Sequence, residues 1–272
     1  MIGFLKNGAT SELITACFRT LNIYWASIGT TLFSINLFAN SFNEESKLLS
    51  SQNLNLNLNL KTPKAPKEIV FPANHEKMVE EVEKLRATDC RFFQSKNYEV
   101  FFTEAHKIPN ILHEIGRLRE ITFREVGEGT NESIDLDKYD QYYHHMFLWD
   151  EETKRVAGAY RMGLGSEIFP KYGMDGFYLN DLFRFDSELH DMMKQSIEMG
   201  RAFIVKEYQQ KPMPLFLLWR GIIHTTLRYP EHKFLLGGVS ISNQFTDFSK
   251  SLMIEFMKSN YYDPYIAQYI KP

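Results

Sequence analysis

The chain has 272 residues, of which 44% are hydrophobic and 14% are aromatic, and its formal net charge is -3. This length suits one domain with additional segments, and the apolar content suffices for a sizeable core. The charge balance lacks the basic excess of nucleic-acid binders, so we expect no nucleic-acid partner. Cys17 and Cys90 fit neither a disulfide framework nor a metal motif, which favours a reducing compartment.

Residues 1–44 differ from the rest of the chain and are expected to form an irregular N-terminal extension that is poorly ordered or helical. Within them, residues 21–38 are uncharged but rich in Asn, Ser and Thr, and they are near the minimum length for crossing a bilayer. A packed or irregular segment is therefore the preferred interpretation. Residues 45–74 are interpreted as a linker, because an Asn-Leu repeat is followed by Pro63 and Pro66, which interrupt helices.

Residues 75–272 alternate between helical and strand-like patterns and are expected to form the folded domain. The predicted elements are, in chain order, a charged helix at 75–87, a strand at 98–103, an amphipathic helix at 108–126, a polar loop at 127–139, a hairpin of strands at 143–149 and 155–162, a strand at 196–205, an apolar helix at 214–228, a strand at 234–241 and a helix at 245–258. The strand–helix–strand order after the hairpin predicts a right-handed crossover between two parallel neighbours. These patterns predict an α/β (α+β) fold.

Charged residues recur at four places in or beside these elements. They are Arg119 on the first long helix, Asp137 and Asp140 in the polar loop, Arg161 on the returning hairpin strand, and Glu198 and Arg201 in the strand at 196–205. A carboxylate inside an otherwise apolar strand is unfavourable without a partner or a role, which favours a function for Glu198.

Two questions about these residues stay open at the level of sequence. Glu198 and Arg201 are three positions apart, so a regular strand points them to opposite faces. Gly200 could permit a β-bulge that re-aims one of them, and without a bulge they cannot both face one site. For Arg119, Asp137 and Asp140, a direct role and a structural Arg–carboxylate network that braces the loop are equally acceptable interpretations.

The motifs occur in the order LR-x3-F, D-x2-D, G-x-YR and E-x-GR. This succession resembles the GNAT branch that contains acyl-homoserine-lactone synthases and the ornithine-lipid and glycine-lipid N-acyltransferases. It is most similar to the "hemolysin-like" acyltransferase domain of Bacteroidetes-type bacteria. The resemblance covers about residues 45–272 and implies a GNAT-like mixed central sheet flanked by helices.

In proteins of that kind the domain often follows a lysophospholipid-acyltransferase domain. This chain lacks the H-x4-D motif of such a domain, so we expect it to be a fragment of a longer two-domain protein. The chain also stops soon after the last predicted helix. We therefore expect the final strands usual in the superfamily to be missing.

The resemblance implies an N-acyltransferase that moves a fatty acyl group from acyl carrier protein, or from acyl-CoA, to the amine of an amino acid in aminolipid biosynthesis. We expect the catalytic residues to be Glu198, Arg201, Asp137 and Asp140, and the substrate-binding residues to be Arg119, Phe123, Arg161, Phe216 and Trp219. Glu198 is the candidate acceptor of the amine's proton. Arg161 and Arg201 are candidate ligands of an acceptor carboxylate, since a guanidinium binds carboxylates in bidentate fashion.

The expected donor is an acyl-phosphopantetheine, and no permanently bound cofactor or metal is expected. Most GNAT enzymes bind the CoA pyrophosphate on a glycine-bearing loop at a helix N-terminus. The corresponding segment here, KEYQQKPMPLF at 206–216, has no glycine, which favours acyl carrier protein. Phe216 and Trp219 on the following apolar helix are candidates for lining an acyl tunnel, although core packing is the simpler interpretation.

Two other functions stay open. One is a signal synthase of the acyl-homoserine-lactone type. The other is a non-catalytic, membrane-associated or interaction module that retains the fold. The expected location is the cytoplasm. Peripheral contact with the inner face of the cytoplasmic membrane is the alternative.

Overall fold

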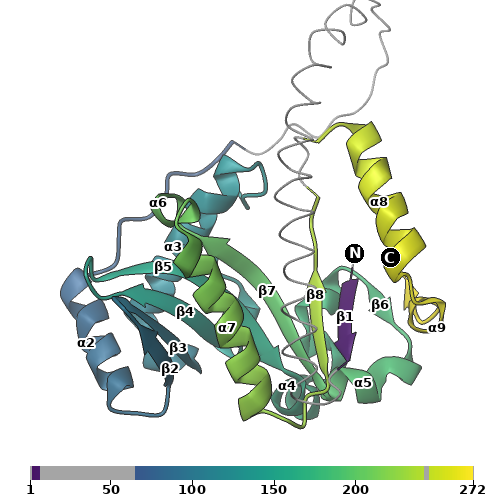
Figure 1. Cartoon of the computed structure of the whole chain (residues 1–272), viewed down its shortest axis with the longest axis horizontal. Helices are drawn as coiled ribbons and strands as arrows, with labels where there is room; N and C mark the ends of the chain where they lie inside the picture. Colours follow the sequence, from purple (N-terminus) through teal and green to yellow (C-terminus); the bar gives the residue numbers. More distant parts are fainter. Residues whose placement is uncertain (1, 7–64, 242–244, 272) are drawn as a thin grey trace, which may run out of the picture.

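The computed structural model describes residues 2–6, 65–241 and 245–271 (Figure 1). The strands are β1 (Ile2–Lys6), β2 (Arg91–Ser95), β3 (Tyr98–Glu104), β4 (His144–Asp150), β5 (Arg155–Leu164), β6 (Arg184–Phe185), β7 (Ser196–Ile204), β8 (Phe234–Gly238) and β9 (Ile270–Lys271). The helices are α2 (His75–Arg86), α3 (Pro109–Glu125), α4 (Gly165–Tyr172), α5 (His190–Lys194), α6 (Lys206–Gln209), α7 (Pro212–Arg228), α8 (Asp247–Tyr261) and α9 (Pro264–Ala267).

Seven of these strands form one mixed sheet in the order β1-β8-β7-β5-β4-β3-β2. The pair β7 and β8 is parallel, and every other neighbouring pair is antiparallel. Helix α7 connects β7 to β8, so the predicted strand–helix–strand crossover is confirmed. The predicted α/β (α+β) fold with a mixed central sheet flanked by helices is confirmed as well.

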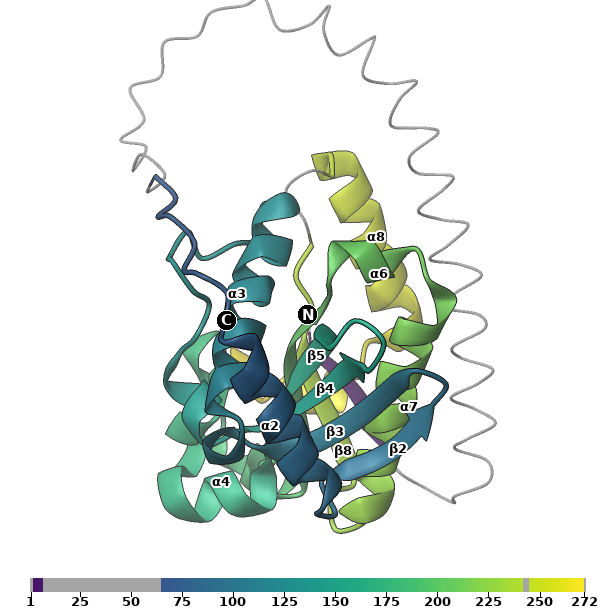
Figure 2. The same cartoon turned by 90° about the vertical axis from the view of Figure 1, so that its left-hand side faces the viewer.

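The sheet is covered on both faces. Figure 2 shows α2 and α3 on one side of it and α7 on the other. Strand β4 is buried at every position, because its alternate side chains pack on opposite sides. Phe147 belongs to the core beneath α2 and α3 and stacks on Phe101 at 5.1 Å between ring centres, whereas Met146 and Leu148 pack with α7.

Local sequence signals account for the start of the two helices on the first face. Asn74 precedes α2, and its side chain accepts a hydrogen bond from the backbone N–H of Lys77. Helix α3 begins at Pro109, and the absent N–H of proline loses no hydrogen bond there, because the first N–H groups of a helix have no partner within it. The predicted helices at 75–87 and 108–126 are therefore confirmed to within a residue or two at each end.

Besides the short elements β1, α6, α9 and β9, two larger parts of the fold were not predicted. The first is β2, which is short, partly exposed and joined to β3 by a tight turn in which Lys96 has a φ of 55°. The second is the segment 165–195, which contains α4, β6, α5 and several 3₁₀ turns. Its apolar side chains form a third core cluster around Tyr143, Phe177 and Leu179.

The predicted extension (1–44) and linker (45–74) lie outside the described residues, apart from 2–6 and 65–74. Residues 2–6 form β1, which pairs antiparallel with β8 at the edge of the sheet. Within the described ranges, no helix combines the length and the hydropathy that crossing a bilayer requires.

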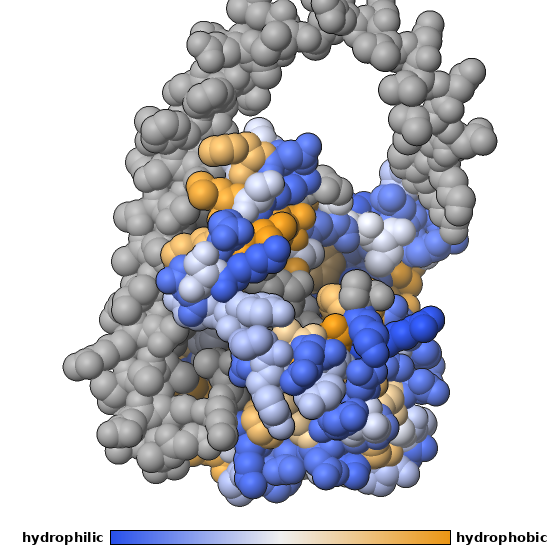
Figure 3. Space-filling model, turned by 90° about the vertical axis from the view of Figure 1, so that its right-hand side faces the viewer, coloured by the Kyte–Doolittle hydropathy of each residue, from blue (hydrophilic) through white to orange (hydrophobic). Residues whose placement is uncertain are grey.

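Helix α8 differs from the other long helices because none of its residues is buried. Phe248, Leu252 and Phe256 are 79%, 59% and 55% exposed. Figure 3 shows hydrophobic side chains gathered on the side of the molecule that carries α8.

The core beneath α3 gives a direct test of the fold. Phe147 is fully buried, so Phe147→Ala should lower the free energy of unfolding by about 3–5 kcal/mol through lost burial and a cavity. Phe71 is 88% exposed, so Phe71→Ala should change it by less than about 0.5 kcal/mol. Urea unfolding followed by circular dichroism measures both values, and equal effects of the two substitutions would contradict the packing described.

Candidate active site

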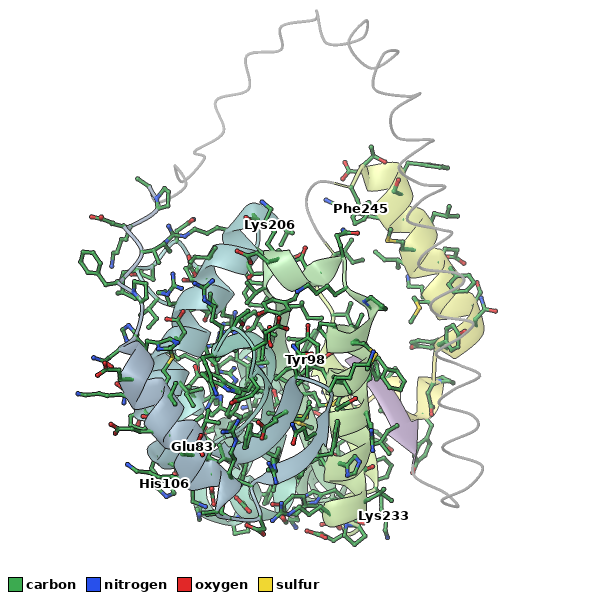
Figure 4. The ribbon with its side chains drawn as sticks, turned by 60° about the vertical axis from the view of Figure 1, so that its left-hand side comes forward. Glu83, Tyr98, His106, Lys206, Lys233 and Phe245 are labelled. Atoms are coloured by element: carbon green, nitrogen blue, oxygen red, sulfur yellow. The ribbon has the colours of Figure 1, made fainter. Side chains whose placement is uncertain are left out.

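The parallel strands β7 and β8 pair over a short distance and then separate. Three residue pairs join them, and the last is Glu198 with Leu236. Beyond this pair, β7 continues beside β5 as far as Ile204, while β8 continues beside β1 (Figure 1). The strands therefore diverge directly after Glu198, toward the end of the sheet where α7 begins. Figure 4 shows this end marked by Lys206 and the opposite end marked by Lys233.

Glu198 is 2% exposed, yet its carboxylate lies beside neutral hydrogen-bond donors. The Tyr143 hydroxyl donates to Oε2 at 2.7 Å, and the backbone N–H of Leu179 donates to Oε1 at 3.0 Å. No Lys, Arg or His of the described chain lies within ion-pair distance of it. Burial raises the pKa of Glu198 to about 7, although these hydrogen bonds and the charge of Arg161 oppose the rise. The group therefore changes its charge near neutral pH.

A β-bulge interrupts β7 just after Glu198. Between the pairs Ala159–Phe203 and Arg161–Gly200, β7 contains one residue more than β5. The left-handed residue of this bulge is Arg201, with a φ of 51°. The bulge that would bring Glu198 and Arg201 to one face is therefore present, with the unusual conformation at Arg201 instead of Gly200.

The bulge also leaves unfilled space on this face. A Cβ built on Gly200 would meet no atom within 4 Å. Gly200 lies directly opposite Arg161 on the neighbouring antiparallel strand, so the space opens on the face that Arg161 occupies. Glu198 is two positions away on the same strand and shares this face.

Next to this space, arginines and aspartates form a buried network. Arg119 donates to both oxygens of Asp140, at 3.1 and 2.9 Å, and its Nε lies 3.1 Å from Asp135. Arg161 donates from Nη1 to Asp137 at 2.6 Å and to Asp140 at 3.1 Å. Burial would raise the pKa of Asp140, but the charges of Arg119 and Arg161 outweigh it and hold this pKa well below its usual value. The network thus keeps Asp140 ionised, whereas burial is the larger effect at Asp135 and raises its pKa.

The D-x2-D spacing has a local structural reason. Asp137 and Asp140 form a reciprocal capping box around the 3₁₀ turn Lys138–Gln141. The side chain of each accepts a hydrogen bond from the backbone N–H of the other. For Arg119 and Asp140, the network therefore matches the bracing interpretation, since each is 1–2% exposed and paired within it.

Some donors in the network point at no described partner. Arg161 Nη2 and Arg201 Nε are buried and have no hydrogen-bond partner among the described residues. The guanidinium groups of Arg161 and Arg201 lie 5.2 and 5.3 Å from the ring centre of Tyr178. Arg201 also lies 3.8 Å from Asp137. The two arginines thus share one aromatic neighbour and have unused donors.

The structure does not bring three of the predicted residues to this cluster. Phe123 packs at the margin of the core beneath α2 and α3. Phe216 is 46% exposed near the start of α7, and Trp219 packs half-buried against the core on that side of the sheet. Helix α7 covers the face opposite Glu198, whose neighbour Ile197 contributes to the α7 core. Phe216 and Trp219 stay candidate donor contacts at the splayed end.

Four groups of this site were not predicted from the sequence: Asp135, Tyr143, Tyr178 and the backbone N–H of Leu179. Asp135 lies two residues before Asp137 in the same loop, but it is outside the D-x2-D motif. Tyr143 begins the strand predicted at 143–149, but nothing in that pattern indicated a contact with Glu198, and Tyr178 and Leu179 belong to an irregular segment without periodicity.

The adjacent histidines have structural contacts. Burial lowers the pKa of both His144 and His145 to about 4, so both are neutral at pH 7. His145 Nε2 lies 2.9 Å from the backbone oxygen of Asp140, and since a carbonyl only accepts, this nitrogen carries the proton. Among the residues that the structure describes, no three His, Cys, Asp or Glu side chains are placed so that they could hold a metal ion.

A known family model matches the segment that holds this cluster. Residues 118–219 match the family model described as an acetyltransferase (GNAT) domain, and this segment contains the network, Tyr143 and Glu198. The chain is 30% identical over 207 residues to a protein named glycine N(alpha)-acyltransferase from Bacteroides thetaiotaomicron, covering 72% of this chain and 61% of that protein. A protein of the same name from Phocaeicola vulgatus is 28% identical over 207 residues, covering 72% of this chain and 63% of that one.

The chain therefore spans a little over three fifths of the length of these relatives. Among solved structures, the crystal structure of the AHL synthase LasI aligns with a TM-score of 0.37 at 14% identity, over 58% of this chain and 77% of that one. The family match and the two relatives agree with the resemblance drawn from the motifs: residues 118–219 match the model of a GNAT acetyltransferase domain.

Proposed function

We propose that this chain is an N-acyltransferase that transfers a fatty acyl group from a carrier thioester to the amine of an amino acid. The observation that carries this proposal is Glu198, a buried carboxylate without a counter-ion at the point where β7 and β8 diverge. Glycine is the first candidate acceptor, because both relatives are named for it. Aminolipid synthesis, in the cytoplasm or at the inner face of its membrane, is the role that we propose for the product.

The chemistry needs one proton acceptor near neutral pH. The acceptor's ammonium gives one proton to Glu198, and the neutral amine then attacks the thioester carbonyl carbon. The C–N bond forms, the C–S bond breaks, and a second proton of the amine goes to the leaving thiolate. Glu198 returns its proton to solvent. The sum is an amide, a free thiol and one released proton.

Arg161 and Arg201 supply a site for the acceptor's carboxylate. Arg161 Nη2 and Arg201 Nε are buried donors without described partners, beside the space over Gly200. A carboxylate there would accept charge-assisted hydrogen bonds from both. The network's three arginines and three aspartates balance, so a zwitterionic amino acid adds no net charge to it.

For the donor we favour acyl carrier protein over CoA. Pro212 and Pro214 occupy two of the first three positions of α7, and proline has no N–H to donate to a pyrophosphate. The start of α7 is therefore a poor phosphate cradle. Phe216, exposed near this end, and Trp219 are the side chains that we propose for contact with the pantetheine arm or the acyl chain.

The proposal predicts a new lipid when the 272-residue chain is expressed in a bacterium that lacks it. Lipid extraction and mass spectrometry should show an N-acyl amino acid, and Glu198→Gln should reduce its rate of formation by about 10²–10⁴-fold, because the proton acceptor is lost. Glu80→Gln, at an exposed position of α2, is the matched control and should leave the product unchanged.

Purified protein makes the outcome decisive. A folded chain that acylates no amine from either acyl carrier protein or acyl-CoA would support the non-catalytic module instead. An acyl-homoserine lactone among the products would support the signal synthase. Full activity in Glu198→Gln would remove Glu198 from the mechanism while leaving the reaction in place.

The activity should fall as the pH drops below neutral. Since the ionised carboxylate accepts the proton, kcat/KM should fall about tenfold per unit as the pH drops below about 7, the pKa to which burial raises Glu198. A pH–rate profile measures this limb. A plateau extending down to pH values near the pKa of an ordinary glutamate would contradict the assignment.

The carboxylate site has its own test in Arg201→Gln. The variant should raise KM for glycine roughly 10- to 100-fold through the loss of charge-assisted hydrogen bonds. KM for methylamine, which has no carboxylate, should change little. Arg155→Gln, at an exposed position of the same sheet, should alter neither value. Equal losses with both amines would show that Arg201 does not bind the carboxylate.

A further inference from the structure

The chain holds Tyr143 against Glu198 by a combination of packing and pairing. Tyr143 directly precedes β4 and is 2% exposed. Gly163 on β5 pairs with Glu198 on β7, and a Cβ at Gly163 would lie 2.6 Å from Cε2 of Tyr143. The tyrosine ring therefore occupies the space that the glycine leaves beside the carboxylate.

The Tyr143 hydroxyl has three polar neighbours but only one proton. It lies 2.7 Å from Glu198 Oε2 and 3.2 Å from the backbone oxygen of Gly176, both of which can accept that proton. The backbone N–H of Tyr178 donates to it at 3.1 Å. The single hydroxyl proton can therefore serve either of two acceptors without movement of the ring.

We propose that Tyr143 is a positioning residue for Glu198. The Tyr143 hydroxyl keeps a hydrogen bond with the Glu198 carboxyl group both before and after that group accepts a proton. The proposal rests on the proposed function, because it assumes that Glu198 takes up the proton of the acceptor amine. The residues of the D-x2-D and E-x-GR motifs do not include Tyr143, so this role is additional to theirs.

The two states differ only in the positions of protons. Before transfer, Tyr143 donates its O–H to the ionised Glu198. When the N–H bond of the ammonium breaks and an O–H bond forms on Oε2 of Glu198, that new O–H donates to the Tyr143 oxygen, and the tyrosine proton turns to the Gly176 carbonyl. Tyr143 keeps its own proton throughout, since burial and the neighbouring Glu198 raise the pKa of its phenol far above the usual value.

The charged and titratable groups around Glu198 come from three places. Arg161 faces it from β5, Tyr139 and Tyr142 face it from the 3₁₀ turn and the residue after it, and Tyr143 contacts it directly. Burial raises the pKa of Glu198, and the Tyr143 hydroxyl opposes this rise by donating to the ionised form. Removal of that hydroxyl should therefore raise the pKa further.

Tyr143→Phe removes the hydroxyl and retains the packed ring, and Tyr142→Phe is its matched control. The Tyr142 hydroxyl donates to the same Gly176 oxygen, at 2.9 Å, but makes no hydrogen bond to Glu198. The ratio of variant to wild-type kcat/KM, measured across pH, cancels the titration of the acceptor amine itself.

In Tyr143→Phe the acid limb of kcat/KM should move up by roughly one to two pH units, the usual value of a hydrogen bond to a charged group. The variant should therefore lose about tenfold or more of the wild-type activity at pH 6 and progressively less above pH 9. KM for the acceptor should change little, since Tyr143 does not contact it. Tyr142→Phe should reproduce the wild-type profile.

A readout independent of turnover separates this inference from the proposed function. An NMR titration of isotope-labelled glutamate carboxyls, with the Glu198 signal assigned through Glu198→Gln, reports its pKa directly. A rise in Tyr143→Phe and none in Tyr142→Phe supports the inference even if the wild-type chain transfers no acyl group, a result that would refute the proposed function alone. Identical titrations and identical profiles in the two variants would overturn the inference and leave the proposed function standing.

Discussion

The arrangement of the site depends on the burial of one carboxylate without a counter-ion. Glu198 is held by a phenol and a backbone amide, whereas each aspartate of the nearby network lies against arginines. Neutral donors offset only part of the desolvation of a carboxylate, so the pKa of Glu198 is raised to about 7 while that of Asp140 is lowered. Glu198 is therefore the acid on this face that is buried without an arginine partner, and its pKa lies near neutral pH.

The backbone places Glu198 and Arg201 together on one face, at the point where two strands separate. The β7–β8 ladder ends at Glu198, and the bulge at Arg201 turns a second charged side chain to the same face. The buried Arg–Asp network fixes the loop that carries Asp137 and Asp140 against this face. The site thus depends on three local features: the end of the β7–β8 ladder, the bulge at Arg201 and the Arg–Asp network that holds the loop.

The sequence was sufficient to predict the repetitive part of the fold and the charged part of the site. Periodicity predicted α3, the β4–β5 hairpin, β7 and α7, since each has a continuous apolar face. Charge within an apolar strand indicated Glu198. Tyr143 was predicted only as the start of a strand, and its contact with Glu198, like the places of Tyr178 and the Leu179 amide, could not be predicted, because these depend on the irregular segment 165–195 packing as a third core cluster. Local propensity carries little information about contacts that only tertiary packing creates.

Whether Glu198 accepts the proton of the amine is tested most directly by a crystal structure of the chain with a bound N-acyl amino acid, which contains both halves of the reaction. We expect its amide nitrogen within hydrogen-bond reach of Glu198, about 3 Å, with the acyl chain leaving between β7 and β8 and the carboxylate on Arg161 and Arg201. A ligand seated elsewhere, with Glu198 still enclosed by Tyr143 and Leu179 and out of reach of the amide, would contradict it.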